Sequence, residues 1–351
     1  MRFLIIGGGA VGGSFAAGLI RAGYEVLIVE ADAAHVAAMC EGGLRIEGRE
    51  VFSVKPCALT PDGLDEAMAG RKADVIVLAV KSQHTASALQ PAVPYLDEDG
   101  VVLTMQNGLN PYDVAEMVGA RRTLAAAINQ MNTDYLEPGL IMFGGPGTIH
   151  VGELDGSVSP RLETLTRIIR DTYVTNTHAT SNMAGYLWGK VALSVILFAS
   201  ALTDDLVADT LADPRNMALL ANATAEVIAI GEAEGVHFHA FDGYEPEVMR
   251  FSTPRDWPGI RRSLDAVAAK YRVSPKPRTG IWRDLKIRRR KTEADGQLLP
   301  LFAIAERIDA SLPITKALLD LVHEMEDGKR EMGPDNLTAI RDISDRVYGK
   351  P

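Results

Sequence analysis

Six consecutive residues near the N-terminus have the types and spacing needed to hold a phosphate group. They are Gly7, Gly8, Gly9, Ala10, Val11 and Gly12, in the pattern G-x-G-x-x-G. The first glycine permits a tight turn, the second lets the backbone approach a pyrophosphate, and the third lets a helix pack closely on a strand. The N–H groups of the following helix would then face the phosphates. The pattern predicts a dinucleotide site, and a glycine-rich turn in another kind of parallel sheet is the alternative.

An acidic residue, Glu30, ends the second apolar stretch, eighteen residues after Gly12. In a dinucleotide fold this position faces the adenosine ribose, where a carboxylate accepts hydrogen bonds from the hydroxyls and repels a 2′-phosphate. No arginine or lysine follows before Arg45. We therefore expect NAD(H) to be favoured over NADP(H). The alternatives are that Asp32 does this work or that neither carboxylate does.

Polar or small residues follow two further apolar stretches, 74–80 and 101–105. They are Lys81 after the first, and Gln106, Asn107 and Gly108 after the second. Ligands of open parallel sheets bind beyond the carboxyl ends of the strands. These residues predict contacts with the nicotinamide ribose or a substrate carbonyl. Turn formation alone is the alternative, because Asn-Gly is a common turn dipeptide.

One lysine, Lys190, stands in a very apolar stretch, between Trp188 and Val191. A buried ammonium group is costly unless it has a partner or a task. Loss of solvent would lower its pKa toward the range that suits proton donation to a carbonyl oxygen. The alternative is a lysine that reaches solvent from the first turn of its helix.

A parallel sheet and a set of helices must position these residues. Apolar stretches predict strands at 1–6, 25–29, 43–46, 51–54, 74–80, 101–105 and 123–128, and a hairpin at 139–143 and 148–151. Helices are expected at 13–22 and 33–40, and then at 185–203, 213–234, 257–271, 291–309 and 313–326. The fold class is therefore an α/β Rossmann dinucleotide-binding domain at 1–178, followed by an all-α C-terminal domain at 179–351. The cleft between the domains is the default ligand site.

Length, charge and apolar runs limit the partners. A chain of 351 residues suits two domains, and its net charge of −10 argues against a nucleic acid or an anionic membrane as partner. The longest apolar run, 191–202, is too short to cross a membrane and is expected to be a buried core helix. The apolar helix at 218–230 suits either an internal core or a homodimer interface.

The cysteines and histidines predict no metal site and no disulfide. Cys40 and Cys57 have no motif spacing and are expected to be reduced thiols. His237 and His239 lack the accompanying cysteines or carboxylates of a metal site. The N-terminus is itself the first strand, so no signal peptide is expected and the predicted location is cytoplasmic.

Taken in order along nearly the whole chain, five segments resemble the ketopantoate reductase (2-dehydropantoate 2-reductase) family. They are Gly7–Gly12, Val80-Lys81-Ser82, Gln106-Asn107-Gly108, Trp188-Gly189-Lys190 and Thr292-Glu293-Ala294-Asp295. The resemblance implies a helical domain of the 6-phosphogluconate-dehydrogenase-like type and an NAD(P)H-dependent oxidoreductase that transfers a hydride to the keto carbon of a small 2-oxo acid. It implies that Lys190 is the general acid that protonates the developing alkoxide. Asn107 and Lys81 would line the nicotinamide end, and Glu293 would be a partner of the lysine and of a substrate hydroxyl.

Three departures from that family fall on ligand-facing positions. Asparagines usually stand four and eight residues after the lysine, where this chain has Ser194 and Phe198. The stretch around Trp282 replaces a serine-rich turn, and Glu30 replaces the basic residue of NADPH-dependent members. We expect Ser194, Phe198 and Trp282, together with Asn107, to contact a substrate that is larger or more apolar than ketopantoate.

The leading hypothesis is an NAD(H)-dependent oxidoreductase of a small 2-oxo or 2-hydroxy acid, or of a related secondary alcohol, with a small-molecule substrate and no nucleic acid or membrane partner. Alternatives are a true 2-dehydropantoate 2-reductase of pantothenate synthesis, a polyol dehydrogenase of the mannitol type, and a non-catalytic dinucleotide-binding sensor. The presence of both Lys190 and Glu293 argues against the sensor. Arg283 or the run Arg288–Arg290 either pairs with a substrate carboxylate or forms a solvated basic face.

Overall fold

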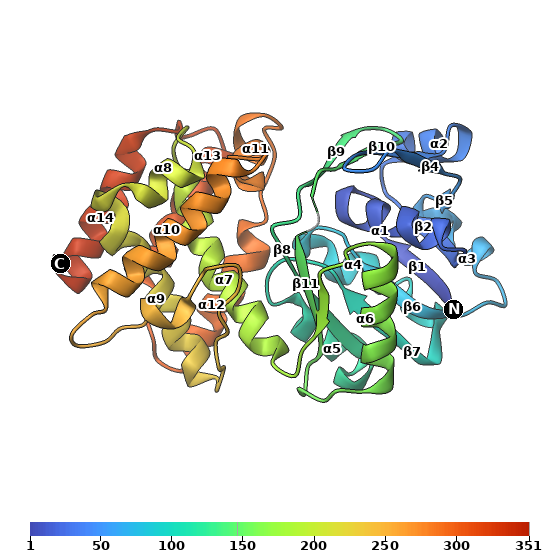
Figure 1. Cartoon of the computed structure of the whole chain (residues 1–351), viewed down its shortest axis with the longest axis horizontal. Helices are drawn as coiled ribbons and strands as arrows, with labels where there is room; N and C mark the ends of the chain where they lie inside the picture. Colours follow the sequence, from blue (N-terminus) through green and yellow to red (C-terminus); the bar gives the residue numbers. More distant parts are fainter. Residues whose placement is uncertain (146, 351) are drawn as a thin grey trace. The chain divides into compact units, whose positions relative to one another are not determined.

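The computed structural model describes residues 1–145 and 147–350, which divide into two units. Unit 1 is Met1–Met183 and unit 2 is Ala184–Pro351, so the division falls five residues after the boundary expected at residue 178. Unit 1 is built on β-sheets and unit 2 on α-helices (Figure 1). The expected fold class, an α/β dinucleotide-type domain followed by a helical domain, is confirmed.

The larger sheet of unit 1 is centred on β1 (Arg2–Ile6). Among the described residues its strand order is β12-β11-β8-β7-β6-β1-β2-β5. The strands from β5 to β8 are parallel, and β11 is antiparallel to β8. The other members are β2 (Glu25–Val29), β5 (Cys57–Leu59), β6 (Ala73–Leu78), β7 (Leu96–Thr104), β8 (Thr123–Asn129), β11 (Thr148–Glu153) and β12 (Thr177–Ala179). The chain order reverses between β1 and β6, which is where open α/β sheets bind ligands.

Helices cover both faces of this sheet. They are α1 (Ala10–Arg21), α2 (Ala33–Glu41), α3 (Leu64–Ala67), α4 (Thr85–Leu89), α5 (Asn110–Val118) and α6 (Pro160–Thr172), with 3₁₀ turns η1 (Pro61–Gly63), η2 (Ser82–His84), η3 (Val93–Tyr95) and η4 (Ala120–Arg122). Alternate side chains of a strand point to opposite faces. Phe3 and Ile5 therefore join the core under α1 and α6, while Leu4 and Ile6 join the core under α4 and α5. Burial on both faces explains the continuous apolar runs of the parallel strands.

A second, four-stranded sheet corrects one expectation. Its order is β4-β3-β10-β9, with β3 (Leu44–Gly48), β4 (Phe52–Val54), β9 (Thr133–Glu137) and β10 (Leu140–Phe143). The expected hairpin of 139–143 with 148–151 is wrong, because β10 pairs with β9 and β3 whereas β11 pairs with β8 and β12. The glycines around 144–147 suggested a hairpin turn, but the strands on either side of them belong to different sheets. The true partner, β9, has a polar sequence that gives little strand signal.

Unit 2 is a helical bundle arranged around α9 (Met217–Ala233), which contacts most of the other helices. They are α7 (Met183–Ser200), α8 (Val207–Ala212), α10 (Trp257–Val273), α11 (Gly280–Lys286), α12 (Ala294–Arg307), α13 (Pro313–Glu326) and α14 (Pro334–Tyr348), with η5 (Pro214–Asn216) and η6 (Pro246–Met249). Residues along α9 are buried against helices of the same unit. The stretch 218–230 therefore belongs to the internal core of unit 2. Of the two roles expected for it, core or homodimer interface, the structure supports the first.

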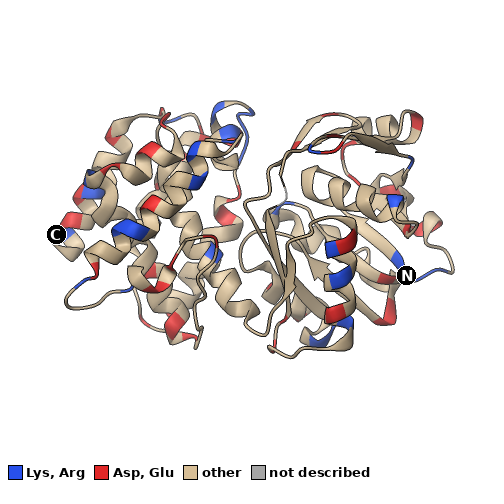
Figure 2. Ribbon diagram, viewed as in Figure 1, with Lys and Arg blue, Asp and Glu red and all other residues tan. Residues whose placement is uncertain are grey.

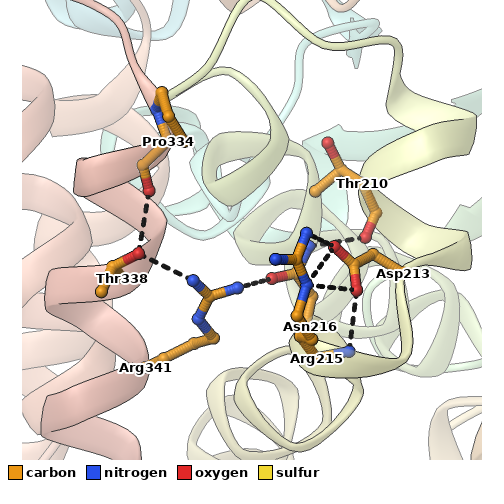
Figure 3. Close-up of polar contacts among 7 residues, drawn as sticks. All are labelled: Thr210, Asp213, Arg215, Asn216, Pro334, Thr338 and Arg341. Atoms are coloured by element: carbon orange, nitrogen blue, oxygen red, sulfur yellow. Dashed lines mark hydrogen bonds and ion pairs between the residues drawn. The ribbon is translucent and has the colours of Figure 1, made fainter.

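Helices α5, α6 and α14 were not expected from the sequence. A network of hydrogen bonds and ion pairs lies between α14 and the segment that links α8 to α9 (Figure 3). Arg341 donates to Asn216 Oδ1 at 2.9 Å and to Thr338 Oγ1 at 2.7 Å, and Asn216 donates to the Thr210 carbonyl at 2.9 Å. Only the first of these bonds joins α14 to that segment, and α14 also packs on α9 and α13 with Leu337 and Ile340 buried.

Within the described residues, one helix, α7, is long and apolar enough to cross a membrane by length and composition. It is longer than the apolar run noted in the sequence, and 78% of its 18-residue window is buried inside the protein. Such burial is typical of a core helix. Lys and Arg are interspersed with Asp and Glu along the helices of both units (Figure 2).

Candidate functional site

The glycine turn of unit 1 lies between β1 and α1. Gly7 has φ of +98°, a conformation that glycine adopts readily. A Cβ atom added to Gly12 would lie 2.0 Å from the Gly7 carbonyl oxygen, so turn and helix pack too closely for any side chain there. Among the described residues, no atom lies within 4 Å of a Cβ added to Gly9. The turn is therefore closed on its sheet side and open at Gly9.

The open side of this turn fits a pyrophosphate. Gly9 is the N-cap of α1, no side chain caps that helix end, and its first turn holds no acidic residue. Helix N-termini carry unpaired N–H groups and a partial positive charge that attract anions. The residues present therefore suit the phosphates of a dinucleotide.

Glu30, directly after β2, lies against the glycine turn. Its carboxylate accepts hydrogen bonds from the Gly8 N–H at 2.7 Å and the Asp32 N–H at 2.9 Å. Asp32 has a different task, since it caps α2 and accepts a hydrogen bond from the Tyr135 hydroxyl at 3.1 Å. A carboxylate has about four acceptor positions, so Glu30 retains capacity for further donors. Of the two candidate carboxylates, Glu30 is the one bonded to the glycine turn.

Two supporting residues, His35 and Tyr135, were missed in the sequence. The Gly139 N–H donates to His35 Nδ1 at 2.9 Å, so the proton is on Nε2, which donates to the Gly8 carbonyl at 3.0 Å. The Tyr135 ring packs edge-on to His35, with centroids 4.9 Å apart. Burial, the hydrogen bond to Asp32 and the nearby negative charges raise the pKa of Tyr135 to about 12. No local signal marks these residues, because β9 and the turn after it reach the glycine loop only through the second sheet.

The loops after β6 and β7 are neighbours, as parallel pairing requires. Gln106 is 6% exposed, and its amide nitrogen donates to the Val80 carbonyl and to Thr85 Oγ1, each at 2.9 Å. This amide holds the two loops together. Asn107 accepts a hydrogen bond at its carbonyl from the Asn110 side chain, Gly108 has φ of +91°, and Lys81 is the N-cap of η2. Roles in cofactor binding for these loop residues stay predictions.

Lys190 lies on α7 in unit 2 and is partly buried. Burial lowers the pKa of Lys190 to about 8, while the negative charge of Glu293 acts in the opposite direction. Glu293 is the N-cap residue of α12. The structure therefore brings together two residues far apart in the sequence, and the pair holds an ammonium group that can release its proton near neutral pH.

Ser194, four residues after Lys190, joins α7 to α12. Its hydroxyl donates to Gln297 Oε1 at 2.9 Å and lies 3.1 Å from the Lys190 carbonyl. Both side chains are nearly buried, at 8% and 6% exposed. Gln297 had not been singled out in the sequence, because a lone glutamine in a helix carries no motif.

The start of α12 is fixed by α13. Glu326 Oε1 accepts hydrogen bonds from the Thr292 N–H and hydroxyl, both at 2.7 Å, and Thr292 Oγ1 accepts from the Ala294 N–H at 3.0 Å. Thr292 precedes Glu293 directly. These contacts hold the backbone that carries the Glu293 carboxylate.

Two predicted substrate residues have other surroundings. Phe198 is completely buried, at 0% exposed, and leaves no side-chain surface for a substrate. Its position eight residues after Lys190 puts it about 80° around the helix. Trp282 on α11 donates its indole N–H to Asp204 at 3.0 Å and has the Arg278 guanidinium 4.7 Å from its ring centroid. Phe198 is therefore better explained as core, and the role of Trp282 stays a prediction.

The basic run after α11 has a buried counter-ion. Asp284 Oδ1 lies 3.2 Å from Arg288 Nη1 and 2.8 Å from Arg290 Nε, and the Asp284 side chain is only 8% exposed. Arg288 and Arg290 are therefore engaged in holding this segment together. Their ion pairs with Asp284 account for these two arginines without a substrate carboxylate, and they do not form a merely solvated basic face.

Comparison with known proteins places most of the chain in one family. The model of the "Ketopantoate reductase PanE/ApbA" family matches residues 3–156, and that of its C-terminal part matches residues 182–326. The 2-dehydropantoate 2-reductase of Pyrococcus abyssi is 29% identical over 194 residues, which are 55% of this chain and 61% of that protein. The enzyme of the same name from Mesorhizobium japonicum is 29% identical over 264 residues, covering 68% and 78% of the two chains.

Solved structures share the fold over nearly the full length. D-mandelate dehydrogenase, in a ternary structure with NADH and anilino(oxo)acetate, has a TM-score of 0.78 at 18% identity, with 94% of this chain and 99% of that one covered. The matches at 3–156 and 182–326 confirm the resemblance drawn from the sequence. This chain belongs to the ketopantoate reductase family, whose members are NAD(P)-dependent oxidoreductases of C=O and CH–OH groups.

Proposed function

We propose that this protein reduces the carbonyl group of a small 2-oxo acid with NADH, or oxidises the corresponding 2-hydroxy acid or a related secondary alcohol. The observation that carries the proposal is Lys190, partly buried on α7 with a pKa of about 8 and with Glu293 as its charge partner. A sensor without catalysis has no need of a buried ammonium group poised in this way.

Lys190 acts as the general acid of the reduction. When bound, the dinucleotide supplies the hydride that the carbonyl carbon receives. As the C=O electron pair moves onto oxygen, Lys190 Nζ gives that oxygen its proton and becomes neutral. The ammonium group stabilises the transition state more than the substrate, because negative charge develops on the oxygen only as the reaction proceeds. In the oxidation the neutral amine takes the proton from the hydroxyl group.

Glu293 and the residues around it keep the ammonium group available. Its negative charge opposes the effect of burial on the pKa of Lys190, so the protonated form is retained near neutral pH. The bonds of Thr292 to Glu326 hold the start of α12, which carries Glu293. Glu293 also remains our candidate partner for a substrate hydroxyl.

Residues of unit 1 would hold the dinucleotide. The backbone at Gly7–Gly12 would bind the pyrophosphate, with Gly9 as the point of closest approach. Glu30 would accept hydrogen bonds from the adenosine ribose, and its charge would disfavour a 2′-phosphate. This supports NAD(H) as the preferred cofactor. Lys81, Gln106, Asn107 and Gly108 are our candidates for the nicotinamide end.

A true 2-dehydropantoate 2-reductase is the second candidate, because curated relatives at 29% identity carry that name. Ser194, in place of the asparagine expected there, and Glu30 favour a different substrate and cofactor. The possible homodimer and the cytoplasmic location stay predictions.

Activity assays with both cofactors test the proposal. The purified chain is given ketopantoate, 2-oxoisovalerate and benzoylformate with NADH or NADPH, and the loss of cofactor absorbance is followed. We expect reduction of at least one 2-oxo acid, with the higher kcat/KM for NADH. Efficient use of ketopantoate with NADPH would support the second candidate instead. Tight dinucleotide binding with no turnover of any 2-oxo acid or secondary alcohol would identify a sensor.

A further inference from the structure

Two pairs of side chains lie one above the other between α7 and α12. Lys190 and Ser194 are four residues apart on α7, and Glu293 and Gln297 are four apart at the start of α12, where the Gln297 N–H donates to the Glu293 carbonyl at 3.0 Å. Residues at this spacing share a helix face. Glu293 acts on Lys190 through its charge, and Ser194 donates to Gln297 at 2.9 Å. The second pair therefore lies about 5.4 Å, one helical turn, from the first.

The amide of Gln297 is held by only one of its ends. Its oxygen accepts the Ser194 hydrogen bond, and within the described part of the chain its nitrogen donates to no group. A side-chain amide nitrogen has two N–H donors. Gln297 as a whole is 6% exposed, but its nitrogen keeps contact with solvent, so its N–H donors are open to a ligand. A ligand bound at Lys190 can provide an acceptor for them.

We propose that Gln297 Nε2 donates a hydrogen bond to the substrate carboxylate while the neighbouring carbonyl oxygen faces Lys190. This inference rests on the proposed function, and it narrows the substrate to compounds with an oxygen acceptor on the carbon next to the reacting carbonyl. A 2-oxo acid meets this requirement, whereas a simple ketone or secondary alcohol does not. Ser194 is then a positioning residue that fixes which end of the amide faces the substrate.

The chemistry of an amide suits this location. A guanidinium or second ammonium group would bind a carboxylate more strongly, but its positive charge would disfavour the protonated form of Lys190. A neutral N–H donor orients the carboxylate and leaves the charge balance of Lys190 and Glu293 unchanged. Its bond to a charged acceptor is stronger than one between neutral groups.

Two substitutions at Gln297, assayed with two matched substrates, test this proposal. The substrates are the 2-oxo acid reduced fastest by the wild type and the primary amide of that acid, and the measured quantity is the ratio of their kcat/KM values. This ratio cancels any difference in folded fraction, and it also cancels changes in the pKa of Lys190, which serves both substrates. In Gln297→Glu a carboxylate faces the substrate carboxylate, so we expect the acid-to-amide ratio to fall about 50-fold or more, chiefly through KM for the acid.

Gln297→Met is the matched control, because methionine has a similar length and no amide. We expect it to lower kcat/KM for both substrates and to change the ratio of the two values by less than about fivefold, the effect of one hydrogen bond. Equal ratios in Gln297→Glu and Gln297→Met would overturn the proposal. Failure of the wild type to reduce any 2-oxo acid would instead overturn the proposed function.

Ser194→Ala tests the positioning role. Losing the hydroxyl frees the amide to rotate, so KM for the acid should rise about fivefold while kcat changes little, and Ser194→Thr should restore the wild-type KM. A fall in kcat with unchanged KM would mean that Ser194 acts on Lys190 rather than on Gln297.

Discussion

The glycine turn of unit 1 and the lysine site of unit 2 are built in opposite ways. The turn uses six consecutive residues, and the groups that we propose bind the dinucleotide are backbone N–H groups at the start of α1. The lysine site uses side chains from α7 and α12, and the bond that joins them spans 103 positions of the sequence. Recognition by backbone is thus encoded in one short segment. Recognition by side chains depends on partners that only the folded chain brings together.

The contacts that hold the two sites in place also differ, being local for the turn and distant in sequence for the lysine site. Gly8 of the turn is bonded to Glu30 and to His35, which stands on α2 and contacts the second sheet. Even without these partners, the positive φ of Gly7 and the close packing of Gly12 on the Gly7 carbonyl would fix the backbone conformation of the turn. Lys190 has no such local constraint, so its pKa depends on burial and on Glu293. We expect substitutions in unit 2 to change chemistry without changing cofactor binding, and substitutions in the turn to do the reverse.

The largest effect is expected for Lys190→Met, which removes the proposed general acid and puts an apolar side chain of similar length in its place. kcat should fall by about 10²–10⁴-fold, the usual contribution of a positioned acid. The Kd for NADH, measured by fluorescence, should stay within about twofold, because the dinucleotide residues lie in the other unit. Lys316→Met is the control, since Lys316 is 63% exposed on α13 and pairs with Asp320. A Lys190 variant with kcat within tenfold of wild type would contradict the proposed role.

The next largest effect separates two glycines of the turn. Gly9→Ala should leave stability unchanged, because its Cβ meets no atom within 4 Å in the part of the chain that the structure describes. It should nevertheless raise the Kd for NADH at least tenfold, or about 1.4 kcal/mol. Gly12→Ala places a Cβ 2.0 Å from the Gly7 carbonyl oxygen and should lower the free energy of unfolding by roughly 1–3 kcal/mol. Thermal unfolding without cofactor measures the second effect. If Gly9→Ala bound NADH normally, the dinucleotide would not approach at this glycine.

The sequence predicted best the features that depend on one short segment, and least those that depend on distant partners. The glycine turn, Glu30 and the strands of the parallel sheet have local signals, and the structure has these elements where they were expected. Ser159 caps α6 by accepting the Leu162 N–H at 3.1 Å, followed by Pro160, so that missed helix did have a recognisable start signal. The β9–β10 pairing had none, because it depends on a second sheet assembled from distant segments.

In unit 2 the apolar surroundings of Lys190 marked it in the sequence, whereas Glu293 was identified only through resemblance to a family. Eight-residue spacing along α7 suggested Phe198, but that position turns away into the core. Gln297 and the bonds between Thr292 and Glu326 carry no motif, and they become visible only when α12 is placed against α7 and α13. Side-chain partners of this kind are set by tertiary packing.

A smaller effect is expected from Glu293→Gln, which tests whether the lysine site depends on a distant charge. Reduction needs protonated Lys190, so kcat/KM should fall above pH about 8 in the wild type, while oxidation should rise up to the same pH. The negative charge of Glu293 raises the pKa of Lys190, so its removal should move both breaks to lower pH by about one unit. Asp295→Asn is the control, because Asp295 is paired with His323 at 2.6 Å. An unchanged profile in Glu293→Gln would mean that burial alone sets the pKa.

The smallest effect is expected at the polar network of Figure 3, which provides a baseline for unit 2. Arg341→Met removes the bond to Asn216 that joins α14 to the segment before α9, and a bond to Thr338 within α14, so the free energy of unfolding should fall by about 1 kcal/mol. Arg215→Met in the same network should cost less, because Arg215 is 76% exposed and its carboxylate partner is only two residues away. Urea unfolding compares the two variants. Both should keep wild-type kcat and NADH affinity, since neither residue touches the turn or Lys190. Loss of kcat in Arg341→Met would mean that the lysine site responds to packing throughout unit 2, and its dependence on distant partners would then extend beyond α12.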